Sequence, residues 1–139
     1  MKKTIIMLVF LLSFTVFAKT VLLELKYNGD KYTIINVSVI NKDYPSSKVS
    51  FYSKDNLYFH IKNKKNKIIE KCSIANPKIL RIPPNKNNNE KNIAAISLKK
   101  GSFIIRFKYH KNMKKLKIID KNGSQTLIFD ENIGGSDEN

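Results

Sequence analysis

The residue types best suited to catalysis are few in this chain. Cys72 is the only cysteine, and His60 and His110 are the only histidines. A catalytic Cys–His pair needs the thiol and an imidazole to converge, but strand alternation predicts that Cys72 points inward and both histidines point outward. A metal site needs a third ligand beside two histidines, and their neighbours are lysines, which repel cations. We predict no catalytic residue, no metal site and no cofactor.

Two other chemical possibilities have simple structural explanations. Asp120 and Asp130 flank an expected hairpin and could bind a hard cation, but Asp120 also begins a typical turn sequence that ends at Gly123. Cys72 could pair with a cysteine of another molecule. Its place in strand alternation favours a buried, hydrophobic role instead. The chain contains none of the sequence motifs of a phosphate-binding loop, a serine hydrolase or a zinc protease.

The charged residues are the more informative feature. The net charge is +15, and the segment from His60 to Lys117 holds 17 basic residues against two acidic ones. Such an excess attracts polyanions. The alternative is compositional, because a chain rich in Lys, Asn and Ile places lysines at any solvent-facing position. The candidate partner-binding residues form two clusters, first Lys62, Lys64, Lys65 and Lys67, and then Lys108, His110, Lys111, Lys114, Lys115 and Lys117.

The expected partner is an anionic surface made of lipid, glycan or acidic protein. A nucleic acid is not expected, because Phe107 and Tyr109, the aromatic residues among these lysines, share the parity of a core-facing strand side. The only arginines are Arg81 and Arg106, although arginine is the better residue for bidentate phosphate recognition. The oligomeric state is left open.

The first eighteen residues have the three-part pattern of a secretory signal peptide. Lys2 and Lys3 precede an apolar stretch at residues 4–17, and Val16 and Ala18 put small residues where a signal peptidase cleaves. The alternative is a membrane anchor, but the stretch is shorter than the roughly 20 residues that a spanning helix needs. We predict cleavage near Ala18, a secreted or periplasmic bacterial protein, and no transmembrane segment in the mature chain.

The elements that must position these residues are strands, because apolar residues recur with a period of two. Residues 21–27 and 31–41 form the first expected hairpin. In its second strand, one side is expected to carry Thr33, Ile35, Val37 and Val39, and the other Ile34, Asn36, Ser38 and Ile40. Turn residues at Asp120–Gly123 predict the last hairpin. A polar loop is expected at residues 85–92 and a flexible acidic tail at 134–139. The remaining expected strands lie at residues 49–52, 57–62, 67–74, 79–82, 93–98, 102–110, 116–120 and 126–130.

Short antiparallel strands separated by frequent turns predict an all-β fold over residues 19–133. We expect a sandwich of about seven to nine strands, with a small β-barrel as the alternative. This tryptophan-free series of strands, with hairpins at Asn28-Gly29 and Asn122-Gly123, resembles the immunoglobulin and fibronectin type III superfamily. The chain lacks the paired cysteines and core tryptophan of antibody domains, so the resemblance implies a fold and no functional residues.

These observations predict an exported, non-enzymatic binding module. Its lysine-rich face, centred on residues 108–117, would contact an anionic partner or a protein surface. The alternative is a periplasmic or secreted inhibitor or assembly factor that acts through the loop at residues 85–92 or through a strand edge. An enzyme is the third and least supported hypothesis.

Overall fold

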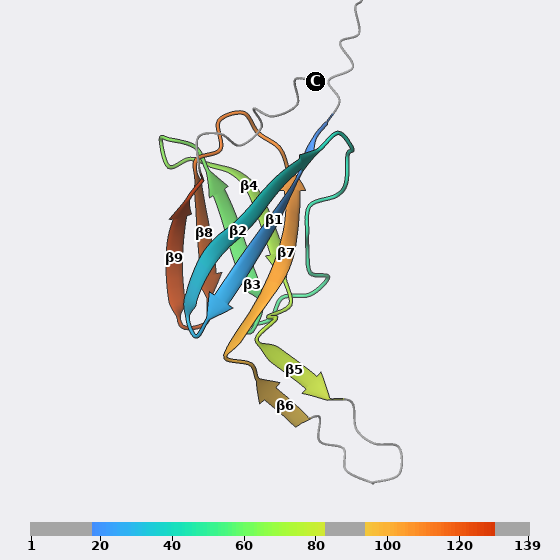
Figure 1. Cartoon of the computed structure of the whole chain (residues 1–139), viewed down its shortest axis with the longest axis vertical. Coiled ribbons are helices and arrows are strands. Elements are labelled where there is room, and N and C mark those ends of the chain that lie inside the picture. The colour runs from blue at the N-terminus through green and yellow to red at the C-terminus, as the bar shows by residue number, and fades with distance from the viewer. Residues whose placement is uncertain (1–17, 83–93, 130–139) are drawn as a thin grey trace, which may run out of the picture.

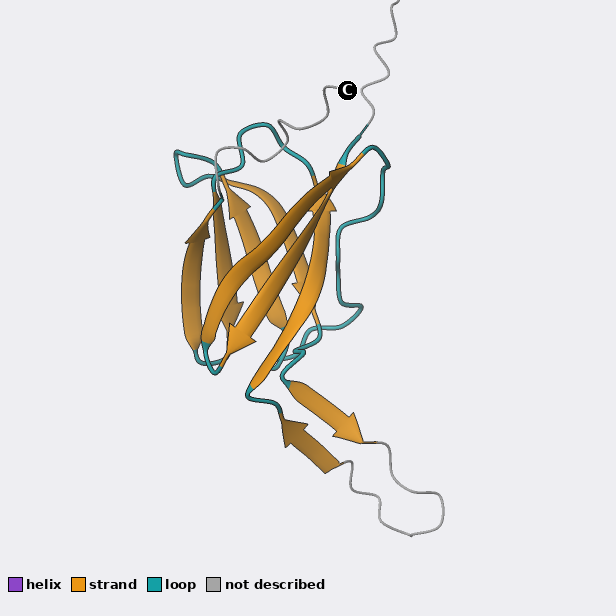
Figure 2. Ribbon diagram, viewed as in Figure 1, coloured by secondary structure: helices purple, strands orange, loops and turns teal. Residues whose placement is uncertain are grey.

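A computed structural model describes residues 18–82 and 94–129 of the chain. Every regular element in these residues is a β-strand paired antiparallel with its neighbours (Figure 1, Figure 2). This confirms the predicted all-β antiparallel fold. The strands are β1 (Thr20–Asn28), β2 (Lys31–Ile40), β3 (Leu57–Lys62), β4 (Ile68–Ile74), β5 (Ile79–Ile82), β6 (Ala94–Ser97), β7 (Lys100–Lys108), β8 (Lys115–Asp120) and β9 (Gly123–Ile128).

Two sheets form the body of the molecule and pack face to face (Figure 1). One has the strand order β2-β1-β7 and the other the order β4-β3-β8-β9. The sheets stay separate, so the body is a sandwich and the barrel alternative is wrong. The first strand lies in the centre of its sheet, whereas in immunoglobulin constant domains it lies at an edge. The superfamily resemblance stays a prediction.

The core lies between the sheets and follows the predicted alternation. Leu23 and Leu25 on β1, Phe59 on β3 and Phe107 on β7 are fully buried. Burial of apolar surface contributes about 25 cal/mol per Å², which makes this shared interior the main stabilising contact between the sheets. The buried hydrophobic residues are Val21, Leu23, Leu25, Tyr27, Tyr32, Leu57, Phe59, Ile61, Cys72, Ile105, Phe107, Met113, Leu116, Ile118 and Phe129.

The two predicted hairpins at Gly29 and Gly123 are confirmed, since β1 pairs with β2 and β8 with β9. Both glycines have positive φ angles, 60° and 144°, which side chains with a Cβ rarely tolerate. The unbroken alternation predicted for residues 33–40 is wrong. A bulge opposite Glu24 and Leu25 shifts the register of β2, so Ile35 turns outward and is 49% exposed.

Side-chain and loop contacts bridge both seams between the sheets. On one side, the Gln125 side chain of β9 accepts a hydrogen bond from the Tyr32 amide of β2 (2.9 Å) and donates one to its carbonyl (3.0 Å). On the other side, the Ser47 amide donates to the Arg106 carbonyl of β7 (2.8 Å), while the Ser73 amide of β4 donates to the Ser47 carbonyl (2.9 Å). These bonds satisfy strand edges that would otherwise be open to pairing with other chains.

The strand predicted at residues 49–52 is wrong. Those residues belong to the loop between β2 and β3, which follows the β4 edge through Ser47 and Ser73 instead of pairing as a strand. Apolar residues in this stretch suggested a strand, but Phe51 and Tyr52 are exposed.

Strands β5 and β6 pair only with each other in the described chain, and they project from one end of the sandwich (Figure 1). Lys78 secures their base. Its ammonium lies 3.4 Å from Asp30 Oδ1, 3.7 Å from Asp120 Oδ2 and 4.6 Å from the centre of the Tyr32 ring. The Lys78 side chain is only 12% exposed, so its charge is held largely out of water between these partners.

Several predictions concern residues outside the described ranges. These are residues 1–17 of the signal peptide predicted at 1–18, the polar loop at 85–92, the tail at 134–139 and the carboxylate of Asp130. Within the described ranges, no helix has the length and apolar character needed to cross a membrane.

Candidate anion-binding surface

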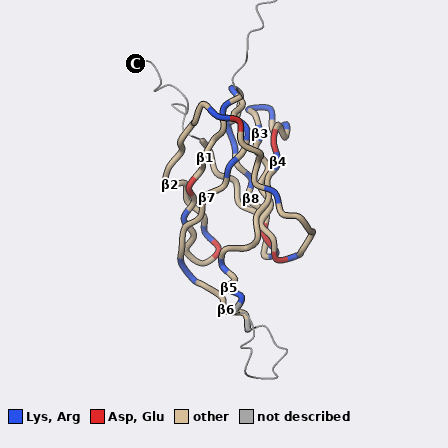
Figure 3. Tube along the Cα trace, turned by 90° about the vertical axis from the view of Figure 1, so that its right-hand side faces the viewer, with Lys and Arg blue, Asp and Glu red and all other residues tan. Residues whose placement is uncertain are grey.

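The fold brings the two lysine clusters to one end of the sandwich. Strand β3 ends at Lys62 and β8 begins at Lys115, and these two residues face each other in the antiparallel pair. The turn that follows β3 and the loop that precedes β8 therefore leave the same sheet side by side. The Lys114 amide donates to the Lys62 carbonyl at 2.8 Å. Both of these loops carry lysines, and Figure 3 shows further lysines or arginines near β5 and β6 at the other end of the sandwich.

The turn at residues 63–67 is held by one side chain. The Asn63 carboxamide oxygen accepts bonds from the amides of Lys65 (2.9 Å) and Lys67 (3.0 Å), a common role for Asn in tight turns. Asn66 has the positive φ of 61° that closes the turn. Lys64, Lys65 and Lys67 are exposed as a result, and their charges extend from a well-defined backbone.

A cavity of about 480 Å³ lies between this turn and the loop before β8. Met113 is a buried residue at its wall, and none of the described lining residues is acidic. A second link across the site is the hydrogen bond from Lys115 Nζ to Asn66 Oδ1 (2.8 Å). The cavity is lined by Asn63, Lys64, Lys65, Lys111, Asn112, Met113 and Lys114.

The positive charge continues onto the outer face of the four-stranded sheet. His60 on β3 is paired in register with Lys71 on β4 and with Lys117 on β8. Partial burial and the charges of Lys71, Lys62 and Lys117 lower the pKa of His60 below its usual value of 6.5. Burial is the larger cause of this shift, and the three lysines around the imidazole on this face add to it.

The ten candidate residues occupy three kinds of place. Lys64, Lys65, Lys111 and Lys114 line the cavity. Lys67 extends from the same turn, and the strand parity of Lys62, Lys115 and Lys117 places them on the outer face beside it.

Two of the candidates lie elsewhere. Lys108 ends β7 opposite Thr20, in the other sheet. The Nε2 atom of His110 lies 3.1 Å from Glu70 Oε2, at the seam between the sheets.

Sequence reasoning missed four residues of this surface. Asn63 and Asn112 supply neutral amides to the cavity, and Lys71 and His60 extend the charged face. Lys71 and His60 could have been found from strand parity, because each alternates with the buried residue Cys72 or Phe59. Asn63 and Asn112 could not have been singled out from the sequence, because asparagine is common throughout the chain.

The described residues give little support to other kinds of site. Cys72 is buried, and burial together with nearby Glu70 raises the pKa of its thiol to about 12, so the nucleophilic thiolate is suppressed. No group of three or more His, Cys, Asp or Glu side chains gathers in residues 18–82 and 94–129 to hold a metal.

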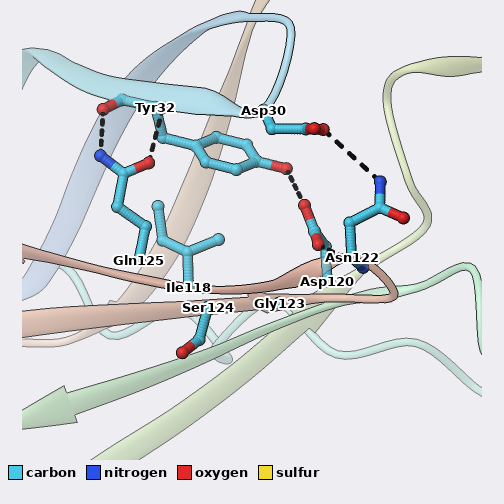
Figure 4. Close-up of a pocket in the computed structure, with 8 residues that line it drawn as sticks. All are labelled: Asp30, Tyr32, Ile118, Asp120, Asn122, Gly123, Ser124 and Gln125. Atoms are coloured by element: carbon cyan, nitrogen blue, oxygen red, sulfur yellow. Dashed lines mark hydrogen bonds between the residues drawn. The ribbon is translucent and has the colours of Figure 1, made fainter.

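A second, polar cavity of about 170 Å³ lies between β2 and the β8–β9 hairpin (Figure 4). Its polar groups bond to one another. The Tyr32 hydroxyl donates to Asp120 Oδ2 at 3.1 Å, and Gln125 bonds to the Tyr32 backbone. Burial, followed by the Asp120 carboxylate, raises the pKa of Tyr32. This arrangement is explained by its role in closing the seam.

No protein-family model matches the chain, and neither a curated protein nor a solved structure matches it. Its function must therefore be inferred from the geometry of its own residues.

Proposed function

We propose that the chain is an exported, non-enzymatic β-sandwich module that binds an anionic partner at its lysine end. We define the lysine end as the cavity between residues 63–67 and 111–114 together with the adjoining outer face of β3 and β8. The observation that carries the proposal is the meeting of two lysine clusters, distant in sequence, around a cavity whose described lining contains no acidic residue.

Two further features support this function. The backbone of the cavity is fixed by hydrogen bonds, one donated by the Lys65 amide to the Asn63 carboxamide and one by the Lys114 amide to the Lys62 carbonyl. Little ordering of the backbone is therefore needed when an anion binds. The amides of Asn63 and Asn112 add neutral donors beside the charges. A surface of this kind attracts anions at long range, and salt screens the attraction.

Binding to heparin, a soluble sulfated polyanion, tests the proposal. We expect the purified protein to bind at low ionic strength and the affinity to fall as salt rises. The triple variant Lys64→Gln, Lys65→Gln, Lys111→Gln should bind roughly tenfold more weakly. A matched triple variant at the opposite end, Lys26→Gln, Lys31→Gln, Lys100→Gln, has the same net charge and should bind like the parent. Equal losses in both variants would mean that only net charge matters.

A protein-binding role, as an inhibitor or assembly factor, is the second candidate. It is favoured by the projecting strands β5 and β6, which expose Leu80, Ile96 and nearby Leu98 at the end of the sandwich opposite the lysine end. Clustered apolar side chains at a projecting element are typical of protein contacts. If this role is correct, Leu80→Ser with Ile96→Ser should abolish copurification of a partner that the lysine variants retain.

A further inference from the structure

One row across the four-stranded sheet combines charge with exposed apolar surface. In register, Ile68 on β4 is paired with Lys62 on β3, Lys62 with Lys115 on β8, and Lys115 with Ile128 on β9. The two isoleucines are 38% and 73% exposed. Neighbouring strands lie about 4.8 Å apart, so the row is about 14 Å wide, with two cations between two apolar side chains.

The next row on the same face is also positive. It runs from Lys71 through His60 and Lys117 to Thr126. The two rows contain no Asp or Glu. Near the start of β3, the loop between β2 and β3 approaches the same face, since the Tyr52 ring stacks on Tyr58 with centroids 5.8 Å apart. The two rows lie nearer the end of β3, where they adjoin the lysine-lined cavity.

The pairing of isoleucines with lysines distinguishes between possible anionic partners. A soluble polyanion uses the lysines and gains nothing from exposed Ile68 and Ile128. A bilayer rich in acidic lipids uses both, because its phosphates attract the lysines while the boundary of head groups and acyl chains accepts apolar side chains. Lysine also suits a diffuse charged surface, where the fixed fork geometry of arginine has no advantage.

We propose that the outer face of β4, β3, β8 and β9 docks on an anionic lipid bilayer, with Ile68 and Ile128 entering the interface on either side of the lysines. This docking surface rests on the proposed anion-binding function and names the partner as lipid. The cavity beside it supplies further cations to the same membrane surface. The two rows are neighbours on one face of the sheet, so both can approach the same bilayer.

Vesicles provide the first test. Binding to phosphatidylglycerol–phosphatidylcholine vesicles is measured by cosedimentation for the parent and for Ile128→Ser with Ile68→Ser. Loss of two inserted side chains should weaken vesicle binding roughly tenfold and leave heparin binding unchanged. The control is Ile104→Ser, which alters a 61% exposed isoleucine on the outer face of β7 and should leave vesicle binding unchanged. Equal vesicle affinities of the parent and the double variant would overturn the docking surface.

A fluorescent reporter gives a second, independent readout. The chain has no tryptophan, so Ile128→Trp introduces a single tryptophan into the proposed contact, and its emission can be excited selectively over that of the tyrosines. Its emission should shift to shorter wavelength when acidic vesicles are added, whereas that of Ile104→Trp should not. If heparin binds and vesicles do not, the docking surface is wrong and the anion-binding function stands. If neither binds at low salt, both proposals are wrong.

Discussion

The amide of Lys114 donates a hydrogen bond to the carbonyl of Lys62, and this contact joins the two stretches of sequence where the lysines are concentrated. It continues the antiparallel pairing of β3 and β8 into their flanking turns. The pairing of β3 with β8 sets the separation between the two lysine clusters. Mutual repulsion between the lysines therefore cannot move the clusters apart without breaking the sheet. The resulting positive end is therefore built into the fold.

Lys78→Met tests the charged contact beneath the projecting strands. Lys78 is largely buried between Asp30, Asp120 and the Tyr32 ring, and its removal leaves the buried Asp120 carboxylate without its cation. We expect the free energy of unfolding to fall by about 3 kcal/mol, measured by urea denaturation.

The matched control is Lys121→Met. Lys121 pairs with Asp55 at 3.5 Å, but both side chains are well exposed, so the loss should stay below about 1 kcal/mol. Similar losses in the two variants would contradict the proposed role of Lys78.

Gln125→Leu tests the seam between the sheets. Gln125 bonds to both backbone groups of Tyr32, and leucine of similar size leaves that amide and carbonyl unpaired. The expected loss of stability is about 2 kcal/mol, measured by thermal and urea unfolding. Ser124→Ala, one residue away on the exposed side of β9, should change the stability by less than about 0.5 kcal/mol. A neutral effect of Gln125→Leu would show that the bridge is dispensable.

His60 provides a pH-dependent probe of the charged face. Its pKa is lowered in the folded protein by partial burial and by Lys71, Lys62 and Lys117. The unfolded chain therefore takes up its proton first as pH falls. The stability linked to His60 is fully present above about pH 6.5 and decreases as the pH drops below that value. His60→Gln should remove this part of the pH dependence of unfolding.

The same histidine should respond to a bound anion. An NMR titration of the ring is expected to give a midpoint below 6.5, and the midpoint should rise when heparin or added salt offsets the lysine charges. A midpoint that is insensitive to both would argue against a concentrated positive potential at this face.

Cys72 should be unreactive in the native protein. It is buried, and its thiol pKa is raised to about 12, so at pH 8 almost none is thiolate. Iodoacetamide should label it at a measurable rate only after unfolding in urea. Rapid labelling of native protein, or a disulfide-linked dimer under oxidising conditions, would instead support the alternative of pairing between molecules.

Much of the fold could be predicted because one face of each core strand is buried. Alternation identified the inward residues of β1, β3 and β7, and turn residues located both hairpins. The bulge that exposes Ile35 could not be predicted, because a bulge depends on pairing with Glu24 and Leu25 rather than on the sequence of β2 alone. The apolar residues Phe51 and Tyr52 suggested a strand at residues 49–52, but they are exposed in a loop. Apolar character alone did not predict a strand there.

The candidate site was predictable only as a list of lysines. Whether two clusters meet depends on which strands pair, and the pairing of β3 with β8 joins residues far apart in the chain. Lys108 and His110 belong to the same sequence cluster as Lys111, yet β7 lies in the other sheet, so they are directed elsewhere. Proximity in sequence is thus a poor guide to a shared face when a chain crosses between sheets.

The central claim is that the two lysine clusters act as one anion-binding surface, and amide chemical-shift mapping during a titration with a heparin fragment tests it most directly. The account predicts shifts in residues 63–67 and in residues 111–117 that follow one binding curve, together with little change at Lys26, Lys31 and Lys100. Shifts confined to one cluster, two separate affinities, or changes spread evenly over the surface lysines would contradict it.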